Sequence, residues 1–96
     1  MDFKQFQLNF LDYLEHVRSS YARTEEDRRK VDFTNGPKYV KVTVDRSVHS
    51  FIVKQDGGKF RQGDILKAAS WAAPAKNYAR GNIMSRNWAH IPWTGA

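Results

Sequence analysis

The sequence contains no cysteine and no long apolar run. The absence of cysteine among its 96 residues excludes a disulfide framework and any zinc or iron–sulfur site held by thiolates. No stretch approaches the roughly 18 apolar residues of a membrane-spanning helix, and the N-terminus lacks the charged and apolar parts of an export signal. We therefore expect one domain over residues 1–96, located in the cytoplasm and without membrane contact.

Motifs typical of catalysis or metal binding are also missing. His16, His49 and His90 are far apart, and none belongs to an HxxxH or HExxH pattern, so no metal site is expected from them. His16 falls on the polar flank of the predicted N-terminal helix, and His49 is expected to be an ordinary, partly buried strand residue. The chain has neither a GxSxG nucleophile turn nor a GK[ST] phosphate loop. We expect a protein that is not an enzyme and that holds no cofactor or metal.

Acidic residues are scarce in the second part of the chain, where the net positive charge lies. Residues 38–96 contain ten Lys or Arg and three Asp, whereas residues 1–37 contain six basic and seven acidic residues. A positive field raises the local concentration of nucleic acids and of acidic protein surfaces. Alternatively, the lysines only keep a small sheet soluble and protect its edges from pairing.

The N-terminal segment has the clearest periodic pattern. Large apolar residues recur there at steps of three and four, as on one face of an α-helix. They are Phe3, Phe6, Phe10, Leu14, Val17 and Tyr21. Asp2 and Gln5 have the spacing of a capping box, so a helix is predicted from about residue 3 with this face buried. A second capping signal at Thr24 indicates either a bend near Arg23 or a second short helix.

After a turn cluster at residues 34–37 the pattern changes to a period of two. Val40, Val42 and Val44 alternate with other residues, as in a strand with one buried face. A reversal at Asp45-Arg46 then leads into the next strand.

Two further strands are expected, over residues 47–54 and 59–68. An Asp-Gly turn within residues 55–58 separates them, and Gly63 interrupts the last strand as a bulge or bend. The prediction is a three-stranded antiparallel meander, with the N-terminal helix on one face and lysines available on the other.

The C-terminal part predicts one more helix. Residues 72–81 are rich in alanine, with Pro74 near the start and Gly81 at the end, which favours a short helix. Residues 82–96 show no sustained period and form a coil tail that either packs over the sheet or hangs free. The expected fold class is therefore α+β, an N-terminal helix on a three-stranded antiparallel sheet with a short C-terminal helix and a coil tail.

Candidate ligand contacts lie in the basic part. In a helix that begins near Pro74, Lys76 and Arg80 project from one face, where two cations can meet neighbouring phosphates. Trp71 precedes this helix, and its ring can stack on an unpaired base, although packing of the helix onto the sheet is its favoured role. The candidate set is Lys38, Lys41, Lys54, Lys59, Arg61, Lys67, Trp71, Lys76 and Arg80.

Four short segments between residues 38 and 83 form a distinctive pattern. They are residues 46–53 (RSVHSFIV), 63–71 (GDILKAASW), 73–76 (APAK) and 79–83 (ARGNI). In these segments the chain resembles a widespread group of small bacteriophage proteins of unknown function. The resemblance implies a phage-encoded accessory protein that acts in the host cytoplasm, and it brings no activity, cofactor or catalytic residue.

Charge and resemblance together lead to two hypotheses. The first is a non-catalytic basic accessory protein of bacteriophage type that binds nucleic acid through a Lys/Arg and aromatic surface. The alternative is a phage modulator or inhibitor that binds an acidic host protein. Random-sequence DNA or RNA separates them, because it displaces a nucleic acid ligand and spares a protein partner.

Overall fold

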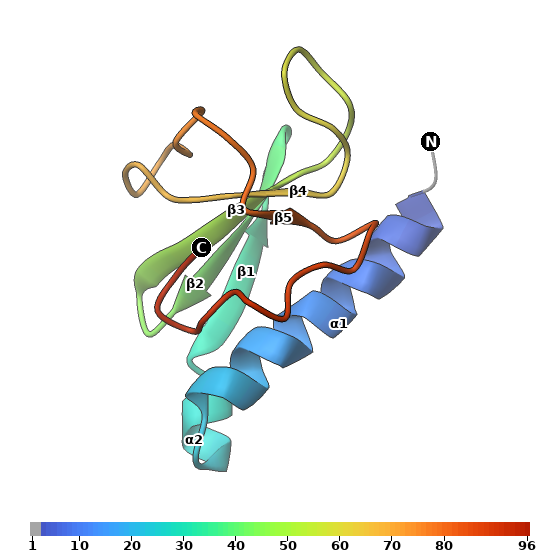
Figure 1. The fold of residues 1–96 in the computed structure, drawn as a ribbon. Helices are drawn as coiled ribbons and strands as arrows, with labels where there is room; N and C mark the ends of the chain where they lie inside the picture. The colour runs from blue at the N-terminus through green and yellow to red at the C-terminus, as the bar shows by residue number, and fades with distance from the viewer. Residues whose placement is uncertain (1–2) are drawn as a thin grey trace.

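The computed structural model describes residues 3–96 and shows a long helix beside a five-stranded antiparallel sheet (Figure 1). The helices are α1 (Phe3–Tyr21) and α2 (Glu25–Arg28). The strands, which pair in sequence order, are β1 (Val31–Asn35), β2 (Tyr39–Val44), β3 (Ser47–Val53), β4 (Asp64–Leu66) and β5 (Gly81–Asn82). The predicted α+β class is confirmed. Asp2, the expected cap of α1, lies outside the described residues.

The predicted apolar face of α1 packs on one face of the sheet. Its buried residues share the main core with residues of β2, β3 and β4. From α1 these are Phe6, Phe10, Tyr13, Leu14 and Val17, and from the sheet Val40, Val42, Val44, Ile52 and Ile65. Phe3 departs from the prediction, since it is exposed at the start of the helix. Burying one such side chain contributes about 1.5–3 kcal/mol, so this stripe holds α1 on the sheet.

A second helix, rather than a bend, follows α1. The Thr24 side chain accepts a hydrogen bond from the Asp27 N–H at 3.1 Å, as an N-cap does. The chain then enters β1, a strand that the sequence did not predict. Its few apolar residues follow a run of three cations and resemble the end of a helical segment, and only pairing with β2 reveals its extended conformation.

The expected third strand is shortened to β4. Gly63 has a φ of +90°, which turns the chain just before β4 begins. Ahead of it, Gly57 and Phe60 form only an isolated bridge. β5 adds a fifth strand of two residues, in which Gly81 pairs with Ile65.

The predicted helix within residues 72–81 is wrong. Ala68 and Pro74 form an isolated antiparallel bridge, and the Ala75 N–H donates to the Lys67 carbonyl at 2.7 Å. An isolated helix this short is marginal despite its alanine content. Hydrogen bonds across the loop and to β4, such as that from the Arg80 N–H to the Ile65 carbonyl, determine the conformation instead.

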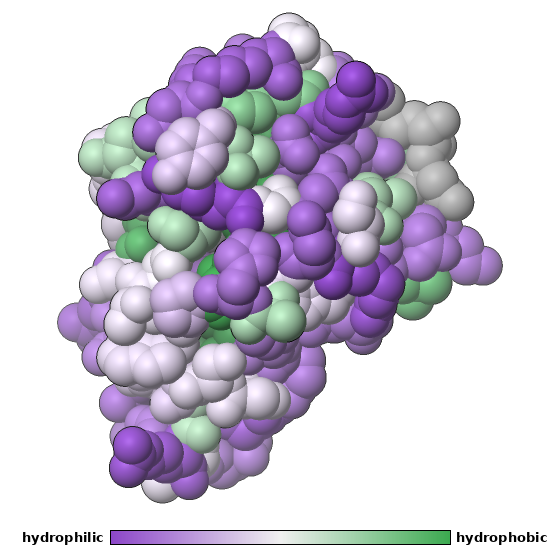
Figure 2. All heavy atoms as spheres, in the orientation of Figure 1, coloured by the Kyte–Doolittle hydropathy of each residue, from purple (hydrophilic) through white to green (hydrophobic). Residues whose placement is uncertain are grey.

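The C-terminal segment packs against the domain, as one of the two alternatives predicted. Ile83, Trp88 and Ile91 are buried in the main core, and the Ala96 N–H donates to the His49 carbonyl at 3.2 Å. Figure 1 shows this segment running beside α1, and Figure 2 shows residues of intermediate hydropathy gathered where it crosses an otherwise mainly hydrophilic face.

Neither helix of the described chain has the length and apolar character needed to cross a membrane.

Candidate functional site

The face of the sheet opposite α1, here called the outer face, is covered by two loops. Loop 54–63 and loop 67–80 rise on that side (Figure 1), and under them lies a second apolar cluster of Phe51, Val53 and Leu66. The loops are joined by the Lys59 ammonium, which donates to the carbonyl oxygen of Asn77. The outer face is therefore a thin apolar layer with loop side chains above it.

Trp71 lies at the tip of loop 67–80 and is 59% exposed, so its favoured role as a core residue is wrong. The loop turns sharply here, because the N–H groups of Ala69 and Ser70 both donate to the Ala73 carbonyl. Lys41 projects from β2 on the outer face, and its Nζ lies 4.2 Å from the centroid of the Trp71 ring. Such an exposed cation–π contact is worth only about 0.5–1 kcal/mol, so a ligand can replace it.

The surface beside this pair is hollowed. An open pocket of about 270 Å³ lies between the outer face of β1, β2 and β3, the β1–β2 turn and loop 67–80. Its lining residues include Lys38, Tyr39, Lys41, Phe51 and Ala72. The rings of Tyr39 and Phe51 meet edge to face with centroids 5.8 Å apart. The hollow thus combines aromatic walls with two lysines, a composition that suits a flat, negatively charged ligand.

A second cation–aromatic pair lies at the other end of the loop. The Arg80 guanidinium is 3.7 Å from the ring centroid of Tyr78, which is exposed. Arg80 also donates to Asn77 Oδ1 and to the Tyr78 carbonyl. These local bonds replace the predicted helix, so Lys76 and Arg80 are not related by one helical turn. Lys76 is exposed on the same loop.

Not every predicted cation belongs to this surface. Lys54 lies on the α1 side, where its Nζ donates to Asn35 Oδ1 at 2.7 Å and to the Gly36 carbonyl at 2.9 Å. Arg61 and Lys67 are exposed at the bases of the two loops. The structure therefore groups Lys38 and Lys41 with Trp71, and Lys59, Lys76 and Arg80 with Tyr78.

Salt bridges form on the α1 side and leave the outer face uncompensated. In residues 3–96 they join Arg28 to Glu15, Lys30 to Asp27 and Arg86 to Asp12. Within that range, none involves a cation of the candidate set. Asp56 and Asp64 accept hydrogen bonds from backbone N–H groups and keep their negative charge. They are outnumbered by the five cations grouped around Trp71 and Tyr78, so the outer face carries a net positive charge.

Tyr39 and Tyr78 are the site residues that sequence reasoning missed. Tyr39 alternates with the buried Val40, so the period of two already indicated that it faces outward. Tyr78 was placed in the predicted helix, where its direction was not defined. Its position two residues before Arg80 is the sequence signal that could have indicated a cation–aromatic pair.

A buried polar cluster lies on the other side of the sheet. A register shift between Val42 and Thr43 of β2 leaves His49 as an extra residue, a β-bulge. His49 and Ser50 are both buried, and the Ser50 hydroxyl is fully covered. Ser50 Oγ lies 2.9 Å from His49 Nδ1 and 2.8 Å from the Tyr13 hydroxyl.

The proton positions in this cluster follow from one carbonyl. His49 Nε2 is 2.8 Å from the Pro92 carbonyl oxygen, which only accepts, so Nε2 carries the proton and Nδ1 accepts from Ser50. Burial lowers the pKa of His49 and raises the pKa of Tyr13, so both groups are neutral. Because Ser50 is buried, it does not present an accessible nucleophile. Its hydroxyl instead fixes the His49 ring, whose bond to the Pro92 carbonyl holds the C-terminal segment.

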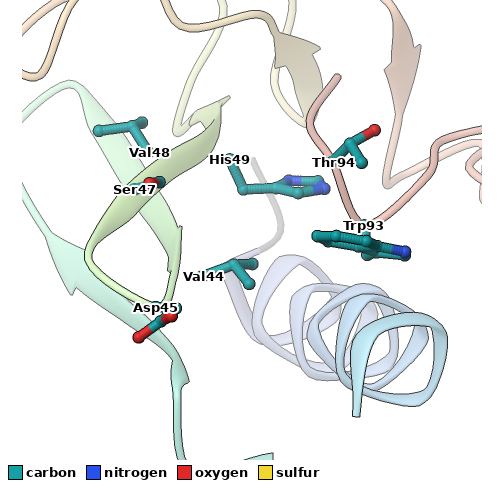
Figure 3. Close-up of a pocket in the computed structure, with 7 residues that line it drawn as sticks. All are labelled: Val44, Asp45, Ser47, Val48, His49, Trp93 and Thr94. Atoms are coloured by element: carbon teal, nitrogen blue, oxygen red, sulfur yellow. The ribbon is translucent and has the colours of Figure 1, made fainter. Parts of the chain in front are cut away.

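An open pocket of about 280 Å³ adjoins this cluster. Figure 3 shows the rings of His49 and Trp93 lying one above the other at this pocket, with Asp45 pointing away from both. No group of three or more His, Cys, Asp or Glu residues suited to a metal ion occurs in the part of the chain described, residues 3–96. Within the described residues, the pocket therefore presents the rings of His49 and Trp93 and no cluster of metal-ligating side chains.

Comparison with curated proteins and with solved structures gave no match. Comparison with family models gave one over residues 2–96, which includes α1 and the C-terminal segment outside the resemblance at residues 38–83. The chain belongs to the family of unknown function DUF7717.

Proposed function

We propose that the protein binds single-stranded nucleic acid on its outer face. Bases stack on the exposed aromatic rings, and phosphates lie near the surrounding lysine and arginine side chains. The observation that carries this proposal is the exposed Trp71 ring beside Lys41 at the tip of a loop.

An exposed aromatic platform favours single strands over duplexes. The bases of a duplex are stacked on each other, whereas an unpaired base presents its face to a ring and gains about 1–3 kcal/mol from stacking. Lys41 lies close enough to Trp71 to meet the phosphate of a base stacked there. Tyr78 with Arg80 supplies a second platform of the same composition.

The cations of the outer face support the electrostatic contribution to nucleic acid binding. Lys38, Lys41, Lys59, Lys76 and Arg80 surround the two rings, and none forms a salt bridge within the described chain. Each phosphate neutralised on a single strand changes the slope of log K against log salt by about 0.7. Binding through four or five phosphates therefore weakens steeply as salt is raised.

The proposal includes a phage-encoded accessory protein that acts in the host cytoplasm. This part rests on the resemblance of residues 38–83 alone. An acidic host protein is the competing partner, because the same cations attract acidic side chains. The distinguishing feature is Trp71, since base stacking requires the ring and charge attraction does not.

Fluorescence anisotropy with labelled single- and double-stranded oligonucleotides tests the proposal at two salt concentrations. Trp71→Ala should weaken single-strand binding about tenfold, equivalent to about 1.4 kcal/mol. Trp93→Ala is the matched control, because Trp93 is also an exposed tryptophan but packs on Tyr21 away from the outer face, with centroids 5.3 Å apart.

Two results would count against the proposal. No association at low salt excludes nucleic acid, and equal binding by the Trp71 and Trp93 variants excludes the platform. A host protein that stays bound in lysate despite nuclease and random-sequence competitor supports the acidic partner instead.

A further inference from the structure

A second surface with an unusual composition lies on the α1 side. Leu8 and Leu11 point away from the core and are 51% and 55% exposed. Phe3 and Phe33 are also exposed and line one groove with Leu11. An open groove of about 540 Å³ runs between α1 and the β1–β2 edge, lined by Phe3, Phe6, Gln7, Phe10, Leu11, Phe33, Asn35, Val40 and Lys54. Contiguous exposed apolar residues with a polar rim are typical of protein–protein contacts.

The charges that flank the two leucines make this surface complementary to itself. Lys4, Leu8, Leu11 and Glu15 follow one another at steps of four, three and four and are all exposed, so they form one stripe along α1. The stripe begins with a cation and ends with an anion. When a second copy of α1 lies antiparallel to the first, each Lys4 meets Glu15 of the other copy and each Leu8 meets Leu11.

β1 agrees with the same symmetry. Phe33, the middle residue of β1, has its ring centroid 5.1 Å from that of Phe10, and it lines one groove with Leu11. Phe33 therefore lies beside the stripe on its Leu11 side. In an antiparallel pair related by a two-fold axis, Phe33 of each copy extends the contact on that side, as an isologous interface allows.

The edge of β1 shows which kind of contact to expect. β1 pairs with β2 alone, but the Phe33 N–H already donates to Asp32 Oδ1 at 2.7 Å and the Val31 carbonyl accepts from Arg18. Asp32 thus guards the edge against an added strand. The contact is made by side chains of α1 and Phe33 rather than by a continuous sheet.

We propose that two copies of this chain associate through the stripe of Lys4, Leu8, Leu11 and Glu15 together with Phe33. Glu15 already pairs with Arg28 at 2.7 Å, but an ionised carboxylate has about four acceptor sites and Glu15 remains half exposed. The five side chains of the contact are far fewer than the roughly 20–30 residues a side of a standard interface, so we expect weak association, with a dissociation constant on the order of micromolar to tens of micromolar.

Charge reversal tests the antiparallel arrangement. Lys4→Glu places two acids opposite each other in a dimer of that variant, and Glu15→Lys places two lysines opposite each other. Each variant alone should therefore associate at least about tenfold more weakly, a loss of about 1.4 kcal/mol. An equimolar mixture of the two should associate again, because every contact then joins a lysine to a glutamate.

Sedimentation velocity over a range of protein concentrations measures this association, and circular dichroism confirms that each variant is folded. Glu25→Lys is the matched control, since Glu25 is an exposed helical acid outside the stripe. Leu11→Glu should abolish association without unfolding the chain, because Leu11 is exposed. A parent chain that stays monomeric up to about 0.5 mM, far above the affinity expected here, overturns the proposal.

A mixture of the charge variants that associates no better than either alone also overturns it. These measurements contain no oligonucleotide, so a negative result would reject self-association without affecting the proposal that the outer face binds nucleic acid.

Discussion

Replacing Phe10 by Ala tests whether α1 is held on the sheet by its apolar face. Phe10 is buried and packs edge to face against Phe33. Truncating a buried Phe costs about 3–5 kcal/mol, and we expect the lower end because Phe10 also lines the open groove beside α1. A loss of about 3 kcal/mol lowers the melting midpoint by roughly 12–24 °C, at about 4–8 °C per kcal/mol for a domain of this size.

The neighbouring residue supplies the control for this prediction. Leu11 lies one position further along α1 but is mainly exposed, so Leu11→Ala should change stability by no more than about 0.5 kcal/mol. Thermal unfolding followed by circular dichroism in dilute solution compares the two variants without a contribution from association. Equal melting midpoints for both would refute the assignment of the buried face.

Two further predictions concern charge. Burial lowers the pKa of His49 below its ordinary value of 6.5, so below pH 6.5 the unfolded chain binds a proton that the folded chain excludes. As the pH is lowered below 6.5, the free energy of unfolding should therefore decrease by at most about 1.4 kcal/mol per pH unit. The melting midpoint should drop less between pH 7.5 and pH 5 in the His49→Gln variant than in the parent chain. Replacing Lys76 and Arg80 together by Gln should weaken oligonucleotide binding about tenfold with little effect on melting. Arg29→Gln is the control, as an exposed cation on α2's side, and equal affinities for both variants would exclude loop 67–80 from the site.

The regular elements of the fold were largely predictable because their signals are local. The steps of three and four in α1 and the alternation of Val40, Val42 and Val44 each indicate one buried face, and apart from the exposed Phe3 both faces are buried as predicted. β1 has no such periodic pattern. Its burial is limited to Val31, and its pairing with β2 is a contact between segments that no local pattern encodes.

The predicted helix in residues 72–81 failed for a related reason. Alanine favours a helix by less than about 1 kcal/mol per residue, and that preference assumes that no stronger contact competes. Here the Arg80 N–H and the Ala75 N–H find acceptors in Ile65 and Lys67. Tertiary hydrogen bonds therefore outweigh propensity, and they leave Trp71 at an exposed tip instead of under a helix.

The candidate site was predictable in composition but not in grouping. Strand alternation already separated two of its lysines, since Lys41 alternates with the buried Val40 and Val42, whereas Lys54 follows Ile52 by two positions and shares its inward side. Applying the same alternation to both strands would have removed Lys54 from the outer face. The pairing of Lys41 with Trp71 required the loop path and had no local signal.

Because the two faces of the sheet have separate cores, stability and binding can be tested independently. Phe10 belongs to the main core on the α1 side, and Trp71 lies above the small cluster on the outer face. Mutations at distant sites without shared partners usually act additively within about 0.5 kcal/mol. The Phe10→Ala variant should therefore have a lower melting midpoint but bind oligonucleotide normally at temperatures where it is folded. The Trp71→Ala variant should keep the melting midpoint of the parent chain and bind oligonucleotide more weakly. If one substitution changed both properties, the outer loops and α1 would form a single cooperative unit, and a loss of binding could no longer be assigned to a contact with the ligand.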